Sequence, residues 1–283
     1  MLQSAFVFAM KLVTRPSHVT IFLAAIVVLT TTSIAQTPAA TPNEKKDEKQ
    51  AARSAKDAAQ NPTAEMIAET AIVAYAGRRE ILNQIRKTTF ERGRTTITNP
   101  NGQTVNATYQ KWILRGDQPG SEKIRLEQDL PEARYSLVRT PAKIFGIYNE
   151  SAFQPREDAV RGFEDQIYHS IDALLWYKEN GSNLVLVGKD KILGVEYHLL
   201  DLTDKNGRKT RYYVSTKYYR VMMLDYESQG VKYTRRFGDH RVAQGTLVPY
   251  RTVLMSGDRV IEESHIGTVT FGQKVDEGLF SET

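Results

Sequence analysis

The sequence predicts an α+β fold, mainly antiparallel β, in which a strongly curved half-barrel sheet is covered on its concave side by an N-terminal and a mid-chain helix. Short segments with apolar residues at every second position follow one another between turn residues, and two longer segments repeat apolar residues at spacings of three and four. Near the end, the stretch Phe237 to Arg251 predicts a strand that ends at Phe237, a turn at Gly245 and an edge-like strand containing Pro249. The apolar stripes of both helices and one face of the sheet must be buried, so we expect the sheet to wrap around the helices. We expect the function to lie in the concavity that this creates.

Residues 1–35 predict a cleaved signal peptide. Lys11 and Arg15 precede a nine-residue apolar run, Ile21 to Leu29, and a small-x-small triplet that ends at Ala35 suits a signal peptidase. The run is much shorter than the roughly 20 residues of a transmembrane helix. An uncleaved anchor stays open as an alternative, as does a true start at Met10 instead of Met1.

Residues 36–62 are polar and Ala-rich and predict a disordered linker, so the folded domain is expected at 63–283. The chain contains no cysteine, which excludes disulfides and an acylated cysteine. The formal charge of +5 falls to +3 when Lys11 and Arg15 are removed with the signal peptide, and basic residues are interleaved with acidic ones. Nucleic-acid binding is therefore disfavoured.

The individual elements follow from periodicity. A first helix is expected at Ala64 to Ile85, bent at Gly77, and a second at Arg161 to Glu179, ended by Asn180-Gly181. Strands are expected at 94–98, 103–114, 122–129, 134–140, 143–148, 183–189, 194–203, 208–216, 219–226, 231–237, 247–255 and 259–271. The turns 99–102 and 204–207 connect two of the predicted hairpins.

No catalytic or metal-binding motif accompanies these elements. The five histidines are scattered singly, and neither a zinc-binding spacing nor a nucleophile elbow nor a phosphate loop is present. Asp239 beside His240 could suggest acid/base chemistry, but neighbours in a strand point to opposite faces. We expect no enzyme activity, no cofactor and no metal.

Three stretches resemble the LolA/LolB-like family of outer-membrane lipoprotein carriers. They are the helix segment Ala74 to Arg79 with Leu82 and Ile85, the paired strands Gly194 to Leu202 and Arg211 to Ser215, and Phe237 to Arg251 with Gly278 to Phe280. The resemblance covers nearly the whole domain and implies a β half-barrel lidded by helices. It also implies a periplasmic location and, as partners, a lipid or lipoprotein acyl chain and possibly envelope membrane proteins.

An acyl chain needs an apolar hollow and few directional bonds, since each buried methylene contributes about 0.8 kcal/mol. The expected lipid-binding residues are apolar side chains on early strands and on the second helix: Trp112, Leu114, Leu126, Leu137, Leu174, Trp176 and Tyr177. The alternatives are a non-catalytic envelope interaction module with a closed core and, less favoured, a hydrolase whose site is assembled from distant residues.

Overall fold

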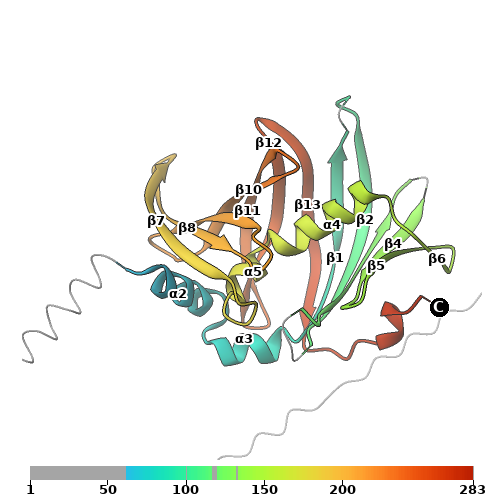
Figure 1. Ribbon diagram of the computed structural model, residues 1–283, viewed down its shortest axis with the longest axis horizontal. Coiled ribbons are helices and arrows are strands. Elements are labelled where there is room, and N and C mark those ends of the chain that lie inside the picture. The colour runs from blue at the N-terminus through green and yellow to red at the C-terminus, as the bar shows by residue number, and fades with distance from the viewer. Residues whose placement is uncertain (1–61, 100, 117–119, 132, 283) are drawn as a thin grey trace, which may run out of the picture. The chain divides into compact units, whose positions relative to one another are not determined.

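The computed structural model describes residues 62–99, 101–116, 120–131 and 133–282. The predicted signal peptide and nearly all of the predicted linker lie outside these residues. The described chain forms one antiparallel sheet with helices packed on one of its faces (Figure 1).

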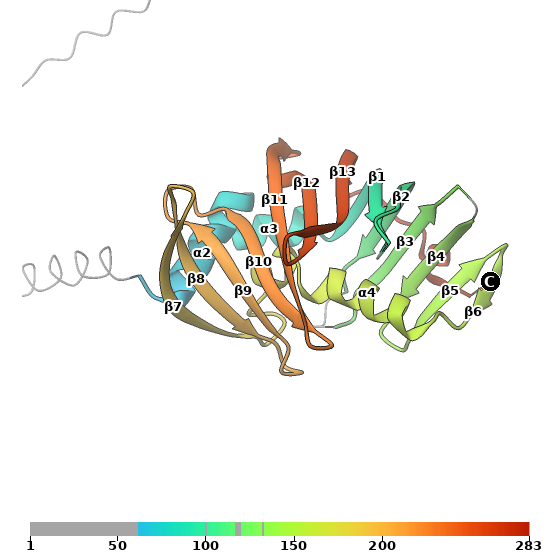
Figure 2. The same ribbon diagram turned by 90° about the horizontal axis from the view of Figure 1, so that it is seen from above.

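The sheet has thirteen strands among the described residues, and all neighbouring pairs with a given register are antiparallel. The first and last strands pair with each other at the centre, and the order is β6-β5-β4-β3-β2-β1-β13-β12-β11-β10-β9-β8-β7 (Figure 2). The strands are β1 Thr88–Thr98, β2 Thr104–Leu114, β3 Lys123–Asp129, β4 Arg134–Arg139, β5 Ile144–Tyr148, β6 Ser151–Phe153, β7 Asn183–Ile192, β8 Val195–Thr203, β9 Lys209–Ser215, β10 Val221–Ser228, β11 Val231–Ala243, β12 Thr246–Ser256 and β13 Arg259–Phe271.

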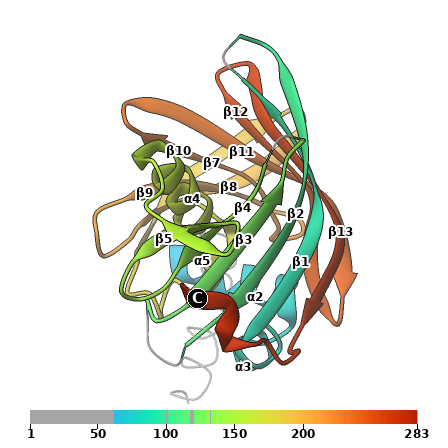
Figure 3. The ribbon, with the colours of Figure 1, turned by 90° about the vertical axis from the view of Figure 1, so that its right-hand side faces the viewer.

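The sheet curves around its helices, which confirms the predicted fold class (Figure 3). Most strands lie where the alternation of apolar residues predicts them. The three-residue edge strand β6 was not predicted, because so short a segment carries no periodicity. The prediction that Phe237 ends a strand is wrong, since β11 continues to Ala243 and the turn follows at Gln244-Gly245. The edge-like strand predicted around Pro249 is β12, which lies inside the sheet between β11 and β13. Its pairing with β13 begins only at Arg251.

The first helical segment is bent as predicted. α2 spans Ala64–Ala76 and α3 spans Arg79–Ile85. Gly77 separates them with φ of 75°, a conformation that glycine adopts without steric cost. The Thr63 hydroxyl caps α2 by accepting from the Met66 N–H at 3.2 Å.

The second helical segment is not the single helix predicted over 161–179. α4 spans Glu157–Tyr168 and α5 spans Ile171–Leu175. The Ser170 hydroxyl caps α5 by accepting from Ala173 N–H, and the Tyr212 hydroxyl donates to the Ser170 carbonyl at 2.8 Å. Arg235 donates to the His169 carbonyl. Side chains of the sheet thus take carbonyls that a continuous helix would use, and the helix breaks there.

Two buried clusters lie between the helices and the concave face. One joins α2 and α5 to strands β8–β12, around Ile72, Leu174 and Leu224. The other joins Phe163 of α4 to strands β2–β4. On the opposite face, the C-terminal 3-10 helix η1, Glu277–Phe280, covers β4 and β5 with Phe280. No helix of the described residues combines the length and apolar character that crossing a bilayer would need.

Candidate functional site: two adjoining cavities

Two cavities lie between the concave face of the sheet and helices α4 and α5. The central cavity, about 210 Å³, is bounded by β1, β2, β3, β11, β12, β13 and α5. Its apolar wall consists of Ile113, Leu126, Ile171, Phe237, Val248, Pro249, Leu254, Ile266, Val269 and Phe271. The side cavity, about 170 Å³, lies between α4, strands β2–β4 and the turn that joins β8 to β9, with Ile113, Ile124, Phe163, Ile167 and Leu202 in its wall.

The two cavities share part of their lining. Lys111, Ile113, Gln166, Ser170 and Asp172 border both. Each cavity alone is smaller than the roughly 300–1,000 Å³ of sites for drug-sized ligands, but together they reach the lower end of that range. The two cavities therefore lie next to each other on the concave face.

Asp172 of α5 is the centre of a charged cluster between the cavities. Its carboxylate accepts from Arg86 at 2.9 Å and pairs with Arg115. Arg86 also donates to the Thr246 hydroxyl at 3.1 Å and to the Leu247 carbonyl at 2.9 Å, so it ties the end of α3 to the start of β12. Burial alone would raise the pKa of Asp172, but the positive charges of Arg115 and Arg86 outweigh it and hold this pKa below its usual value.

Arg115 is held on its other side by an aromatic ring. Its guanidinium carbon lies 3.7 Å from the centre of the Trp176 ring, and its Nε is buried with no hydrogen-bond partner among the described residues. The cluster therefore fixes the first residue after β2 against α5 and places two arginines around one carboxylate beside the cavities.

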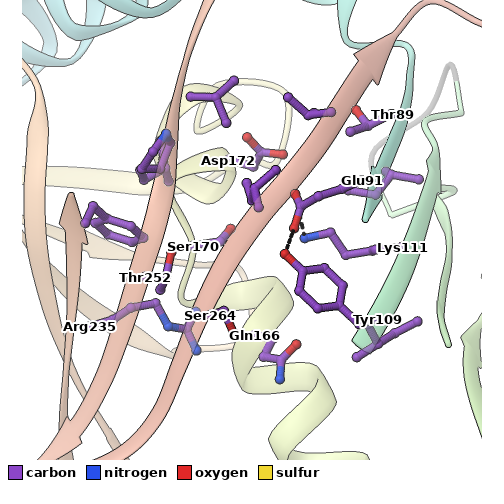
Figure 4. Close-up of a pocket in the computed structure, with 18 of the residues that line it drawn as sticks. Thr89, Glu91, Tyr109, Lys111, Gln166, Ser170, Asp172, Arg235, Thr252 and Ser264 are labelled. Carbon is purple, nitrogen blue, oxygen red and sulfur yellow. Dashed lines mark hydrogen bonds and ion pairs between the residues drawn. The ribbon is translucent and has the colours of Figure 1, made fainter. Parts of the chain in front are cut away.

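A second polar group projects from the sheet into the central cavity (Figure 4). The Tyr109 hydroxyl donates to the Glu91 carboxylate at 2.7 Å, and the Lys111 Nζ lies 3.4 Å from the same carboxylate. Burial raises the pKa of the Tyr109 hydroxyl, and the neighbouring Glu91 charge raises it further. Tyr109 is therefore a neutral donor to Glu91, whose carboxylate also lies beside Lys111.

Only one of the seven predicted lipid-binding residues lines a cavity. Leu126 borders the central cavity, and Leu137 packs beside it in the same buried cluster. Trp112 and Leu114 pack with the Phe280 cluster on the opposite face of the sheet, because the cavity-facing residues of β2 are Tyr109, Lys111 and Ile113. They therefore lie on the face of the sheet opposite to the one that we expected.

Leu174, Trp176 and Tyr177 do lie on the concave side, but in a closed core. All three pack in the cluster with α2, and Leu174 is fully buried. Trp176 Nε1 donates to the Asn83 side chain at 2.9 Å, and the Tyr177 hydroxyl donates to Glu69 at 2.9 Å. They hold the helices to one another and do not border either cavity.

The cavity residues that the sequence did not single out are mostly polar or β-branched. Glu91, Lys111, Thr252 and Ser264 interrupt the apolar positions of the concave face. The sequence did contain a signal for these residues. Polar residues at strand positions that face the concavity indicate a cavity there, since a fully packed apolar core would exclude them. No group of three potential metal-ligating side chains occurs among the residues that the structure describes.

A strongly curved antiparallel sheet with helices in its concavity is an α+β half-barrel. A LolA superfamily protein from Nitrosomonas europaea superposes with a TM-score of 0.54 at 13% identity, covering 77% of this chain and 97% of that one. A putative outer membrane lipoprotein-sorting protein domain from Vibrio parahaemolyticus superposes with a TM-score of 0.51 at 14% identity, covering 72% and 93%. Neither a family model nor a curated protein sequence matches the chain. The solved structures show that this chain has the LolA-like fold.

Proposed function

We propose that this protein is an exported, periplasmic carrier that binds an acyl chain of a lipid or lipoprotein in the central and side cavities. The single observation that carries the proposal is the pair of cavities on the concave face, which share part of their lining and each combine apolar side chains with polar groups. Eight methylenes placed against these walls would contribute about 6 kcal/mol of transfer free energy, before the cost of immobilising the ligand. The predicted signal peptide supports the periplasmic location.

The charged groups in the cavities favour binding over catalysis. Asp172 is engaged by two arginines, and Glu91 by Tyr109 and Lys111. The buried His169 has its Nδ1 2.7 Å from the Thr210 hydroxyl and its ring stacked 4.0 Å from Tyr226, outside both linings. These groups are held in ionic and hydrogen-bonded pairs, which suits a fixed wall around a ligand.

Extraction of lipid from the natively purified protein tests the proposal. Thr252 lies half-buried in the wall of the central cavity, so Thr252→Trp should fill it. Thr108 is exposed on β2 next to the cavity-facing Tyr109, so it points to the opposite face, and Thr108→Trp is the matched control. We expect about one lipid per protein in the wild type and in Thr108→Trp, and at least a tenfold loss in Thr252→Trp.

Other outcomes would reject the carrier. A wild-type protein that carries no lipid and binds no added fatty acid would favour the envelope interaction module. Equal retention in both tryptophan variants would show that lipid binds elsewhere on the surface. Turnover of a model ester would favour the hydrolase.

A further inference from the structure

The two cavities differ in charge. Among the described lining residues, the central cavity has three basic and three acidic side chains: Arg86, Lys111 and Arg235 against Glu91, Asp172 and Glu262. The side cavity has five basic and three acidic side chains: Lys111, Arg115, Arg139, Lys205 and Arg208 against Glu122, Asp172 and Asp204. The side cavity therefore carries a surplus of two positive charges, whereas the central cavity is balanced.

Two arginines that line the side cavity are held in fixed positions. Arg139 donates to Glu122 at 2.7 Å, and Arg208 donates to Asp204 at 2.6 Å. Both guanidinium groups lie over the ring of Tyr168, with the Arg208 carbon 3.3 Å and the Arg139 carbon 5.6 Å from its centre. The arginines are thus positioned before any ligand arrives, which lowers the entropic cost of binding.

Two cations that line the side cavity are not fully paired among the described residues, although Arg115 pairs with Asp172. Lys205, in the exposed turn between β8 and β9, makes no ion pair among the described residues. Arg115 leaves its Nε without an acceptor. An unpaired lysine and a surplus of positive charge around one cavity are features that an anionic oxygen group would balance.

The apolar surface continues inward from this charged wall. Ile124 and Phe163 line the side cavity, and Ile113 borders both cavities. From there the wall of the central cavity is formed by Phe237, Leu254, Val269 and other apolar side chains. A ligand that is charged at one end and apolar along its length matches this arrangement.

We propose that the ligand is an anionic amphiphile whose carboxylate or phosphate headgroup lies against Lys205, Arg208 and Arg115 in the side cavity, with its hydrocarbon chain in the central cavity. This inference rests on the proposed carrier function and specifies its substrate class. It sets this protein apart from a carrier that recognises acyl chains alone. The headgroup can come from a free fatty acid or from a phosphate ester, and both offer the same anionic oxygens.

Four probes with the same twelve-carbon chain test the proposal: dodecanoate, dodecyl phosphate, dodecyl maltoside and dodecyltrimethylammonium, each below its micelle concentration. Calorimetry should show the two anionic probes binding at least tenfold more tightly than the neutral and cationic probes. Raising the salt from 0.1 M to 1 M shortens the screening length from about 10 Å to about 3 Å, so the preference should shrink. A stronger response to dodecyl phosphate or to dodecanoate identifies the phosphate or the fatty-acid source.

Lys205→Glu tests the position of the headgroup, because this exposed turn residue can be reversed in charge without disturbing the core. Lys217→Glu, in the exposed turn between β9 and β10 and outside both linings, is the control. We expect Lys205→Glu to weaken binding of dodecyl phosphate about tenfold and leave dodecyl maltoside unchanged, since only the anion feels the reversed charge. The control should alter neither.

The outcomes separate the two proposals. Equal affinity for all four probes would overturn the anionic headgroup and leave the acyl-chain carrier standing. Failure of every probe to bind would overturn both. An anionic preference that Lys205→Glu does not reduce would overturn the side cavity as the headgroup site.

Discussion

Replacement of Asp172 by asparagine should be among the most damaging isosteric changes in this protein. The change removes the only carboxylate that pairs with both Arg86 and Arg115 among the described residues. Removing one partner of a buried ion pair costs about 3–5 kcal/mol because the remaining charge stays buried. The Asp172 side chain is 29% exposed towards the cavities, so we expect the lower end, about 3 kcal/mol.

Arg86→Met should cost less, about 1–2 kcal/mol, although Arg86 is more deeply buried. It removes the hydrogen bonds to Thr246 and Leu247 but leaves Asp172 paired with Arg115. Urea unfolding followed by Trp fluorescence measures both variants, with Asp258→Asn in an exposed turn as the control. The reasoning is refuted if the unfolding free energy of Asp172→Asn lies within 0.5 kcal/mol of the wild-type value. It is also refuted if Arg86→Met is more destabilising than Asp172→Asn.

The pH dependence provides an independent check on the same pair. The pKa of Asp172 is lower in the folded protein than its ordinary 3.8, so its stabilisation is complete above that value and is lost as pH falls through the folded pKa. The stability difference between the wild type and Asp172→Asn should therefore be constant from pH 7 to 5 and shrink below about pH 3.8.

Two further predictions concern the helices. Gly77→Ala should lower the unfolding free energy by about 1 kcal/mol because φ is 75° there. Gly162→Ala, inside α4 with open space around the added Cβ, should instead raise it by about 0.5–1 kcal/mol. Urea midpoints compare the two variants, and equal effects would contradict the conformational argument. Burial, with a smaller contribution from Arg235 and Arg208, lowers the pKa of His169 from 6.5 to about 4. The unfolded chain therefore binds this proton first, and stability should fall by up to about 3 kcal/mol as pH drops from 6.5 to 4. His169→Gln should remove most of this fall in the unfolding free energy between pH 6.5 and 4. An unchanged fall in the variant would mean that other groups cause it.

The fold was predictable because its local signals agree with its tertiary structure. Gly77 interrupts a helical pattern at the position where the backbone needs positive φ, and the alternation in strands such as β9 matches burial on one face. The break between α4 and α5 was not predictable in the same way. It depends on Tyr212 and Arg235, which reach the Ser170 and His169 carbonyls from strands far along the chain.

The cavity residues were harder to predict because β2 is apolar or aromatic on both faces. Tyr109 and Ile113 face the concavity, whereas Trp112 and Leu114 face the other side. When both alternating sets of residues in a strand are apolar, the sequence does not reveal which set faces the cavity. In this protein η1 determines which face is which. Its Phe280 covers Trp112 and Leu114, and these residues form a separate small core on the face away from the cavities.

The wall of the central cavity includes the parts of β12 and β13 that do not pair with each other. β12 pairs with β13 from Arg251 to Ser256, whereas the end of β13 continues to Phe271 beside β1. Pro249 lies two residues before that pairing begins, and it has no N–H that the missing neighbour would have to satisfy. Val248 and Val269 pack in one buried cluster and belong to the apolar wall of the central cavity. The proline that suggests an edge strand thus lies where β12 does not pair with β13, in the wall of the central cavity.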